Sequence, residues 1–156
     1  MQGFTKSGVN ALSFATDLEQ GKLAEDEFLK VLETKPELVQ PLFRVHRPDG
    51  NFAAYDYMIY ARFELKHDIA SKVTGNLCFE TKSIKRTQSD YIVYQFYRNF
   101  SDTPSWLIFR VDTLRADLRK HSESAIVIPV GDQANNWSNI FKIEFVETNF
   151  RNIRIG

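Results

Sequence analysis

Cysteine and histidine are scarce in this sequence. Cys78 is the only cysteine among 156 residues, which excludes an intrachain disulfide and any zinc site rich in thiolates. Its apolar neighbours predict a buried thiol on a strand. The three histidines, His46, His67 and His121, lie far apart in the sequence without the spacing of metal ligands, so we expect no zinc centre.

Charge of one sign is not in excess. The 20 basic and 20 acidic residues cancel, so any nucleic-acid binding must rest on a local basic patch rather than on the field of the whole protein. Long hydrophobic runs are missing too, because no segment approaches the length that spans a membrane and the first residues do not resemble a signal peptide. We therefore expect no membrane partner and a cytoplasmic, reducing location.

Several enzyme motifs are absent. The sequence contains no Gly-x-Ser-x-Gly elbow, no Walker pattern and no glycine-rich dinucleotide pattern, which argues against triad hydrolases and the common nucleotide-binding folds. Internal repeats and low-complexity tracts are absent as well. With 43% hydrophobic and 13% aromatic residues, residues 1–156 are expected to form one globular domain.

Helix and strand signals alternate along the chain. A first helix is expected from Thr16 or Asp17, either of which is a suitable N-cap, to about Thr34. A second is expected from Asp112 or Thr113 through residue 120. The expected strands, chosen for their β-branched and aromatic content, are residues 77–81, 91–97, 106–109, 125–130 and 140–146. This order predicts an α/β (α+β) domain with a central mixed β-sheet flanked by helices.

Both helices have a recognisable apolar side. In the first, the predicted buried stripe consists of Leu23, Ala24, Phe28, Val31 and Leu32. In the second, Leu114 and Leu118 form the buried side, and the charged residues are expected on a solvated face: Asp112, Arg115, Asp117 and Arg119.

Residues 55–68 stand out because ionisable side chains interrupt an apolar, aromatic-rich segment. Asp56, Glu64, Lys66 and Asp68 have matching parity, and side chains two apart on a strand share a face. Charged groups on the inner side of a sheet are costly unless they pair, accept or donate hydrogen bonds, or bind a metal. This stretch is therefore the candidate functional site.

The pattern Asp56…Glu64-Leu65-Lys66 resembles the PD-(D/E)xK nuclease superfamily, in which an Asp begins one strand and Glu-x-Lys lies on the next. The following succession looks like the small phage-type members: Thr74-Gly75-Asn76, a strand ending in Glu80, then Ser89-Asp90-Tyr91. The resemblance covers residues 21 to about 120. Two features depart from it, because Tyr55 stands where the family name has Pro and no clear turn separates Asp56 from Glu64. The resemblance implies a restriction-endonuclease-like fold and a metal-dependent nuclease that hydrolyses DNA phosphodiester bonds.

The resemblance also implies roles for these residues. Asp56 and Glu64 would hold Mg²⁺ or Mn²⁺, with the Leu65 carbonyl as a further oxygen ligand. Lys66 would orient the attacking water and stabilise charge on the phosphate. A second interpretation from the residues alone is an ion pair of Lys66 with Glu64 or Asp56 on a partly exposed sheet face. The same fold would then serve as a catalytically inactive nucleic-acid or protein-binding module.

Four further carboxylates could take part in the site or have a purely structural role. Glu25 either lies in solvent at the edge of the first helix's stripe or reaches towards the site, as the first-helix Glu does in several nucleases of this superfamily. Glu80 could accept a second metal, although a salt bridge with Lys82 is favoured. Asp68 could be a strand-end residue that turns the chain, and Asp90 is expected to close the loop before its strand.

Possible nucleic-acid contacts lie downstream of the site. Lys82, Lys85 and Arg86 form the densest basic run, in a loop or a short helix, and would be either plain solvated surface or a phosphate-contacting edge for DNA. Trp137 either stacks on a base or packs over a sheet edge from a loop. The sequence leaves the oligomeric state open, with a homodimer as one possibility.

Overall fold

The computed structural model describes residues 6–46, 58–130 and 136–156. The chain divides into two compact units, residues 1–41 and 42–156, and each is described by itself. Whether they act as the single domain expected from the sequence stays a prediction.

The first unit is mainly one long helix, α1 (Lys6–Thr34), followed by α2 (Pro36–Val39). The predicted end at Thr34 is confirmed. The predicted start at residue 16 or 17 is wrong, since α1 begins at Lys6, because Thr and Asp also occur inside helices and do not always mark an N-cap. Ala24 and Phe28 are buried as predicted, whereas Leu23 is exposed.

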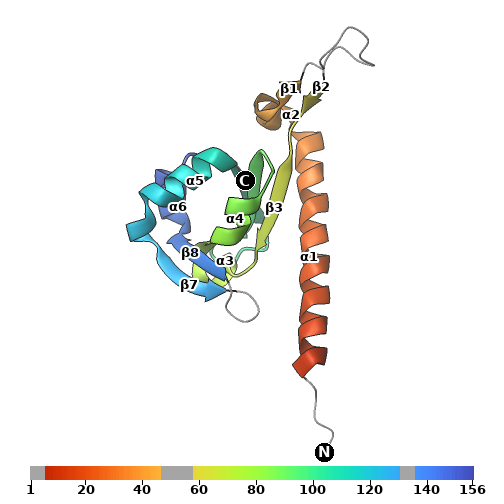
Figure 1. Ribbon diagram of the computed structural model, residues 1–156. Helices are drawn as coiled ribbons and strands as arrows, with labels where there is room; N and C mark the ends of the chain where they lie inside the picture. The colour runs from red at the N-terminus through yellow and green to blue at the C-terminus, as the bar shows by residue number, and fades with distance from the viewer. Residues whose placement is uncertain (1–5, 47–57, 131–135) are drawn as a thin grey trace, which may run out of the picture. The chain divides into compact units, whose positions relative to one another are not determined.

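The 3-10 helix η1 (Gln40–Leu42) leads into the second unit. There, β1 (Arg44–His46) pairs with β2 (Met58–Tyr60) as an antiparallel ribbon. The largest sheet has the order β3-β5-β6-β9, and its first strand, β3, is labelled in Figure 1. Its strands are β3 (Phe63–Asp68), β5 (Tyr91–Tyr97), β6 (Pro104–Arg110) and β9 (Ile153–Ile155). Since β3 and β5 are parallel and the other pairs antiparallel, the sheet is mixed, and the α/β class is confirmed.

A second, antiparallel sheet has the order β4-β8-β7. Its strands are β4 (Asn76–Glu80), β8 (Asn136–Lys142) and β7 (Ile126–Val130). The remaining helices are α3 (Ser71–Thr74), α4 (Thr81–Arg86), α5 (Val111–Lys120), η2 (Ser122–Ser124) and α6 (Ile143–Asn149). Gly75 ends α3 with a φ of 66°, a left-handed conformation that suits glycine.

One hydrophobic core joins the two sheets to α4, α5 and α6. Phe79 of β4 lies at its centre and contacts the rings of Tyr94, Phe109, Phe141 and Phe150 at centroid distances of 4.8–6.1 Å. The side chains of β5 that enter this core have even numbers, Ile92, Tyr94 and Phe96. The core face of β5 is therefore defined, and the register of β3 against β5 determines which β3 side chains share it.

Two expected strands are corrected within this unit. The strand expected over residues 140–146 ends at Lys142, and α6 begins at Ile143. Alternating burial of Phe141, Lys142, Ile143 and Glu144 continues across that change, so periodicity alone did not reveal it. The strand expected to end at Thr81 ends one residue earlier.

The predicted solvated face of α5 is also only partly right. Leu114 and Leu118 are buried as expected, but Asp117 is buried too. Its carboxylate accepts hydrogen bonds from the backbone and guanidinium of Arg151, at 2.8–3.3 Å. Arg115 is half-buried rather than solvated. The helix begins at Val111 without a side-chain cap, so neither Asp112 nor Thr113 is its N-cap.

Candidate active site

Glu64 and Lys66 lie next to each other on one face of β3. The carboxylate Oε1 of Glu64 is 2.7 Å from Nζ of Lys66, and the two side chains are 28% and 27% exposed. In the parallel register with β5, Glu64 is opposite Ile92 and Lys66 opposite Tyr94, so both point to the core face of the sheet. Among the described strands β3 is an edge strand, and its charged side chains therefore reach the rim of the core.

Helix α4 contacts this pair through the hydroxyl group of Ser83. Lys66 Nζ donates a hydrogen bond to Ser83 Oγ at 2.6 Å, and Ser83 Oγ donates to Glu64 Oε1 at 3.2 Å. Thr87, directly after α4, also helps to lower the pKa of Glu64 through its hydroxyl group. The helix forms immediately after β4, so a short tight connection brings these hydroxyl groups to the edge of β3. Of the two structures expected here, a loop or a short helix, the helix is the one that forms.

The environment favours the ionised form of Glu64. Burial by itself raises the pKa of its carboxyl group, but hydrogen bonds from Lys66, Thr87 and Ser83, together with the charge of Lys66, outweigh it. The net pKa is below the ordinary value. Glu64 is therefore a carboxylate at neutral pH, which is the form that binds a cation.

Asp68 has a structural role at the end of β3. Its carboxylate accepts hydrogen bonds from the backbone N–H groups of Ser71, at 3.2 Å, and Cys78, at 3.0 Å. It thereby joins β3 to the turn and to β4, as expected of a strand-end residue. Burial raises its pKa, while these two hydrogen bonds and the neighbouring His67 act in the opposite direction.

A surface depression of about 290 Å³ adjoins the pair and is lined by Lys66, Asp68, Cys78, Glu80 and Tyr94, among others. Cys78 is partly exposed here, not buried as predicted. Glu80 is exposed at the N-cap position of α4 without a side-chain capping bond. Burial raises the pKa of the Tyr94 hydroxyl, with smaller contributions from Cys78, Asp68, Glu80 and Glu64.

The oxygen atoms near Glu64 are of the type that a hard cation prefers as ligands. Arg62 O accepts a hydrogen bond from Tyr91 N at 3.1 Å, so strand alternation turns the Leu65 carbonyl away from β5 and towards the edge of the sheet. Within residues 6–46, 58–130 and 136–156, no group of three His, Cys, Asp or Glu side chains is close enough to hold a metal. Asp56, the expected second carboxylate, lies outside the described residues, and Glu25 belongs to the other unit.

The predicted basic run lies beside the pair. Lys82, Lys85 and Arg86 are all on α4 and all exposed, and α4 is the helix whose Ser83 contacts Glu64 and Lys66. Trp137 is on β8, not in a loop, and the residue is 56% exposed.

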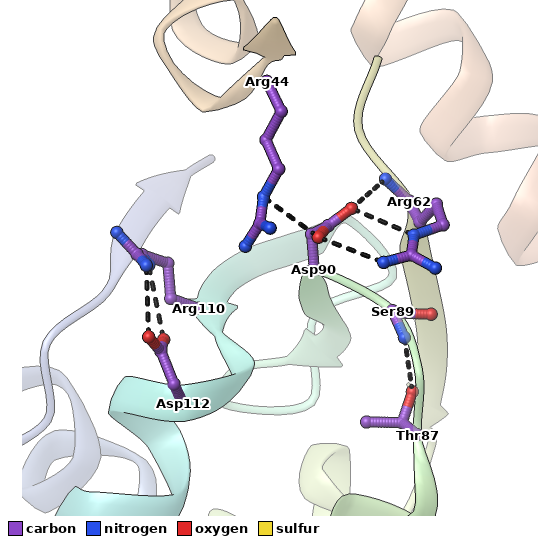
Figure 2. A network of polar contacts seen from close by, with 7 residues as sticks. All are labelled: Arg44, Arg62, Thr87, Ser89, Asp90, Arg110 and Asp112. Carbon is purple, nitrogen blue, oxygen red and sulfur yellow. Dashed lines mark hydrogen bonds and ion pairs between the residues drawn. The ribbon is translucent and has the colours of Figure 1, made fainter. Parts of the chain in front are cut away.

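The sequence did not reveal an arginine network at the other end of β3. Asp90, buried just before β5, accepts hydrogen bonds from the backbone N of Arg62 at 3.0 Å and from its Nε at 3.2 Å. Arg44 Nε lies 3.0 Å from Asp90 Oδ1, as Figure 2 shows. Asp90 closes the loop as expected. The one sign of this network in the sequence was the even number that Arg62 shares with Glu64 and Lys66.

No helix in the described part of the chain is long and apolar enough to cross a membrane. Comparisons of the chain with family models, with curated proteins and with solved structures give no match.

Proposed function

We propose that this protein is a metal-dependent nuclease that hydrolyses phosphodiester bonds in DNA, with a restriction-endonuclease-like arrangement around β3. The observation that carries the proposal is the pair of Glu64 and Lys66 on one face of an edge strand, at the rim of the core. A carboxylate with a lowered pKa and an ammonium group 2.7 Å away form a compact acid–cation arrangement beside an exposed basic helix.

The donor set fits Mg²⁺ or Mn²⁺, which prefer oxygen ligands and keep several waters. Glu64 and the outward-facing Leu65 carbonyl would hold the ion together with Asp56, and Glu80 is a candidate for a second ion. When bound, the ion supplies a nucleophilic water at neutral pH and neutralises charge on the phosphate.

Lys66 and the basic residues of α4 would act on the attacking water and on the phosphates. The Lys66 ammonium, held by Ser83, would orient the attacking water and stabilise the charge that develops on the phosphate oxygens. Lys82, Lys85 and Arg86 would contact neighbouring phosphates of the DNA strand. Because these contacts carry no base information, the proposal does not include sequence preference.

A second candidate function is suggested by the contacts that Glu64 and Lys66 make with each other. Glu64 and Lys66 already satisfy each other and Ser83, which is also what a structural ion pair would do. In that case the fold would serve as a catalytically inactive nucleic-acid or protein-binding module.

A cleavage screen with matched variants separates the two candidates. Duplex, single-stranded and branched DNA would be incubated with Mg²⁺ or Mn²⁺ and, as a control, EDTA. We expect cleavage by the wild type only with metal, and none by Glu64→Ala or Lys66→Ala. Lys120→Ala, a basic-to-neutral change on the exposed end of α5, should cleave normally.

Stability measurements make the result of Lys66→Ala interpretable. Since both side chains still reach solvent, at 28% and 27% exposed, and Glu64 would keep the hydrogen bond from Ser83, we expect Lys66→Ala to cost only about 1 kcal/mol of unfolding free energy. Lost cleavage at nearly unchanged stability supports catalysis. A wild type that cuts no DNA with either metal, combined with a loss of about 3–5 kcal/mol as for a buried pair, favours the structural ion pair.

A further inference from the structure

The arginine network adjoins a polar depression of about 270 Å³. Arg44, Arg62 and Arg115 line it, together with the polar segment Thr87, Gln88 and Ser89. The lining includes two carboxylates, Asp90 and Asp112, so the formal charge of the depression is positive. Asp112 is moreover paired with Arg110 at 3.1 Å. In a protein with no net charge, this is a local positive site.

Two guanidinium groups share the single carboxylate of Asp90. Arg62 approaches it through Nε and Nη2, at 3.2 and 3.4 Å, which would suffice to neutralise a buried acid. Arg44 adds a second positive charge through its Nε at 3.0 Å. The side chains of Arg44 and Arg62 remain 52% and 56% exposed, whereas that of Asp90 is 2% exposed. Asp90 therefore orients two guanidiniums at the surface with one positive charge in excess.

Oriented guanidiniums suit phosphate. The planar fork of Arg offers five N–H donors and binds phosphate oxygens in pairs, and a second-layer carboxylate that holds the fork in place reduces the entropy lost on binding. Figure 2 shows Arg44 and Arg62 converging on Asp90 from opposite sides.

Two residues of the depression, Arg62 and Thr87, relate it to the Glu64–Lys66 pair. Arg62 precedes Glu64 by two residues and shares its parity, which places the two Cα atoms roughly 7 Å apart along the strand direction. Thr87 lines the depression, and its hydroxyl also helps to lower the pKa of Glu64. A strand whose phosphate lies at the pair would thus present a neighbouring phosphate to the arginines.

We propose that Arg44 and Arg62, held by Asp90, form a phosphate subsite that binds the backbone of a DNA strand next to the Glu64–Lys66 pair. This subsite would be a substrate contact of the proposed nuclease, and its role therefore rests on that proposed function. Its binding chemistry is independent of hydrolysis, so it can be tested without metal.

The test measures binding of a labelled DNA strand and a labelled duplex in EDTA by fluorescence anisotropy, over a range of NaCl concentrations. Arg44→Gln is the informative variant, because Asp90 keeps its hydrogen bonds from Arg62. We expect it to weaken binding about three- to tenfold and to reduce the slope of log K against log salt by about 1. Arg44→Lys should restore most of the slope, since it returns the charge.

Lys120→Gln is the matched control, because it removes one positive charge from an exposed position outside the depression. Its affinity and salt slope should equal those of the wild type. The subsite is overturned if Arg44→Gln binds like this control, or if the wild type binds neither form of DNA. Thermal melting of each variant checks that an effect on binding does not come from unfolding.

The outcomes distinguish the subsite from the catalytic proposal. A wild type that cleaves DNA while Arg44→Gln binds normally keeps the nuclease and removes the subsite. A wild type that cleaves nothing while Arg44→Gln loses affinity and salt dependence keeps the subsite and assigns it to a binding module.

Discussion

The Asp90 carboxylate makes more polar contacts than either Glu64 or Lys66. Its buried carboxylate accepts from the Arg62 backbone, from the Arg62 guanidinium and from Arg44. We expect Asp90→Asn to lower the free energy of unfolding by about 2–3 kcal/mol, the range for hydrogen bonds to a charged group. Urea denaturation at pH 7 measures it. Asp112→Asn, at an exposed carboxylate also paired with an arginine, should cost less than about 1 kcal/mol.

The cost of Asp90→Asn should depend on pH. The hydrogen bond from the Arg62 side chain holds the pKa of Asp90 below its ordinary value of 3.8, although burial opposes it. A lowered pKa means that the carboxylate's stabilisation is complete above the unfolded value and is lost as pH falls through the folded value. Urea midpoints of wild type and Asp90→Asn should therefore differ fully at pH 7 and 5.5 and begin to converge as pH falls below 3.8. A difference that persists undiminished at pH 3 would contradict this.

At the scale of elements, Arg115 fixes the end of α4. Its Nε donates to Ile84 O at 3.0 Å, and its Nη2 donates to Lys85 O and Thr87 O at 3.1 and 3.2 Å. These carbonyls belong to the last turn of a six-residue helix and the residue after it, where no intrahelical partners exist. The guanidinium thus caps α4 and keeps Ser83 and Thr87 against Glu64.

We expect Arg115→Ala to destabilise α4 more than the whole protein. Loss of three hydrogen bonds from a charged donor should cost about 1–3 kcal/mol and raise amide hydrogen exchange at residues 84–87 first. Arg119→Ala, an exposed arginine one turn later on α5, is the control and should leave exchange in α4 unchanged. Equal exchange in both variants would show that α4 does not depend on this cap.

Sequence patterns predicted elements best where local signals agreed. The strand over residues 91–97 matches β5 residue for residue, because β-branched and aromatic residues run without a breaker between a turn and a second polar loop. Lys66 beside Glu64 followed from parity alone. The change from β8 to α6 at Ile143 was missed, since its N–H is taken by Gly75 O, a partner far away in the sequence.

The polar networks were the least predictable part. Asp117 with Arg151, and Asp90 with Arg44, are separated by 34 and 46 residues in the sequence and are joined only by the fold. A sequence pattern read over one or two turns cannot contain such pairs. Both buried aspartates were therefore assigned from local spacing, which was right for the loop at Asp90 and wrong for the solvated face at Asp117.

At the scale of the whole molecule, Glu64 and Lys66 lie at the edge of the hydrophobic core of the second unit. Glu64, Lys66 and Asp68 share a sheet face with Ile92, Tyr94 and Phe96, yet they are on the edge strand and stay partly exposed. Such a position keeps the charges accessible to water and ions while the neighbouring core holds the strand rigid. Rigid support of this kind is what a site that positions phosphate needs.

Divalent ions should stabilise the protein if the carboxylates near β3 hold one. Because the unfolded chain has no such site, binding adds about 1.4 kcal/mol when the free Mn²⁺ concentration is tenfold above Kd, which would raise Tm by about 3–6 °C for a chain of this size. Glu64→Ala should abolish the shift, and Lys66→Ala should retain it, because Lys66 does not contribute a ligand. Glu123→Ala, at an exposed carboxylate on η2, should retain it as well.

Calcium extends the same measurement to mechanism. It also prefers oxygen ligands but is larger and less strict in geometry than Mg²⁺, so we expect a Tm shift without efficient cleavage. Melting curves of the wild type that coincide in EDTA and in millimolar Mn²⁺ would contradict a metal site on β3. The Glu64–Lys66 pair, with its hydrogen bonds to Ser83, would then be a structural feature of the sheet edge.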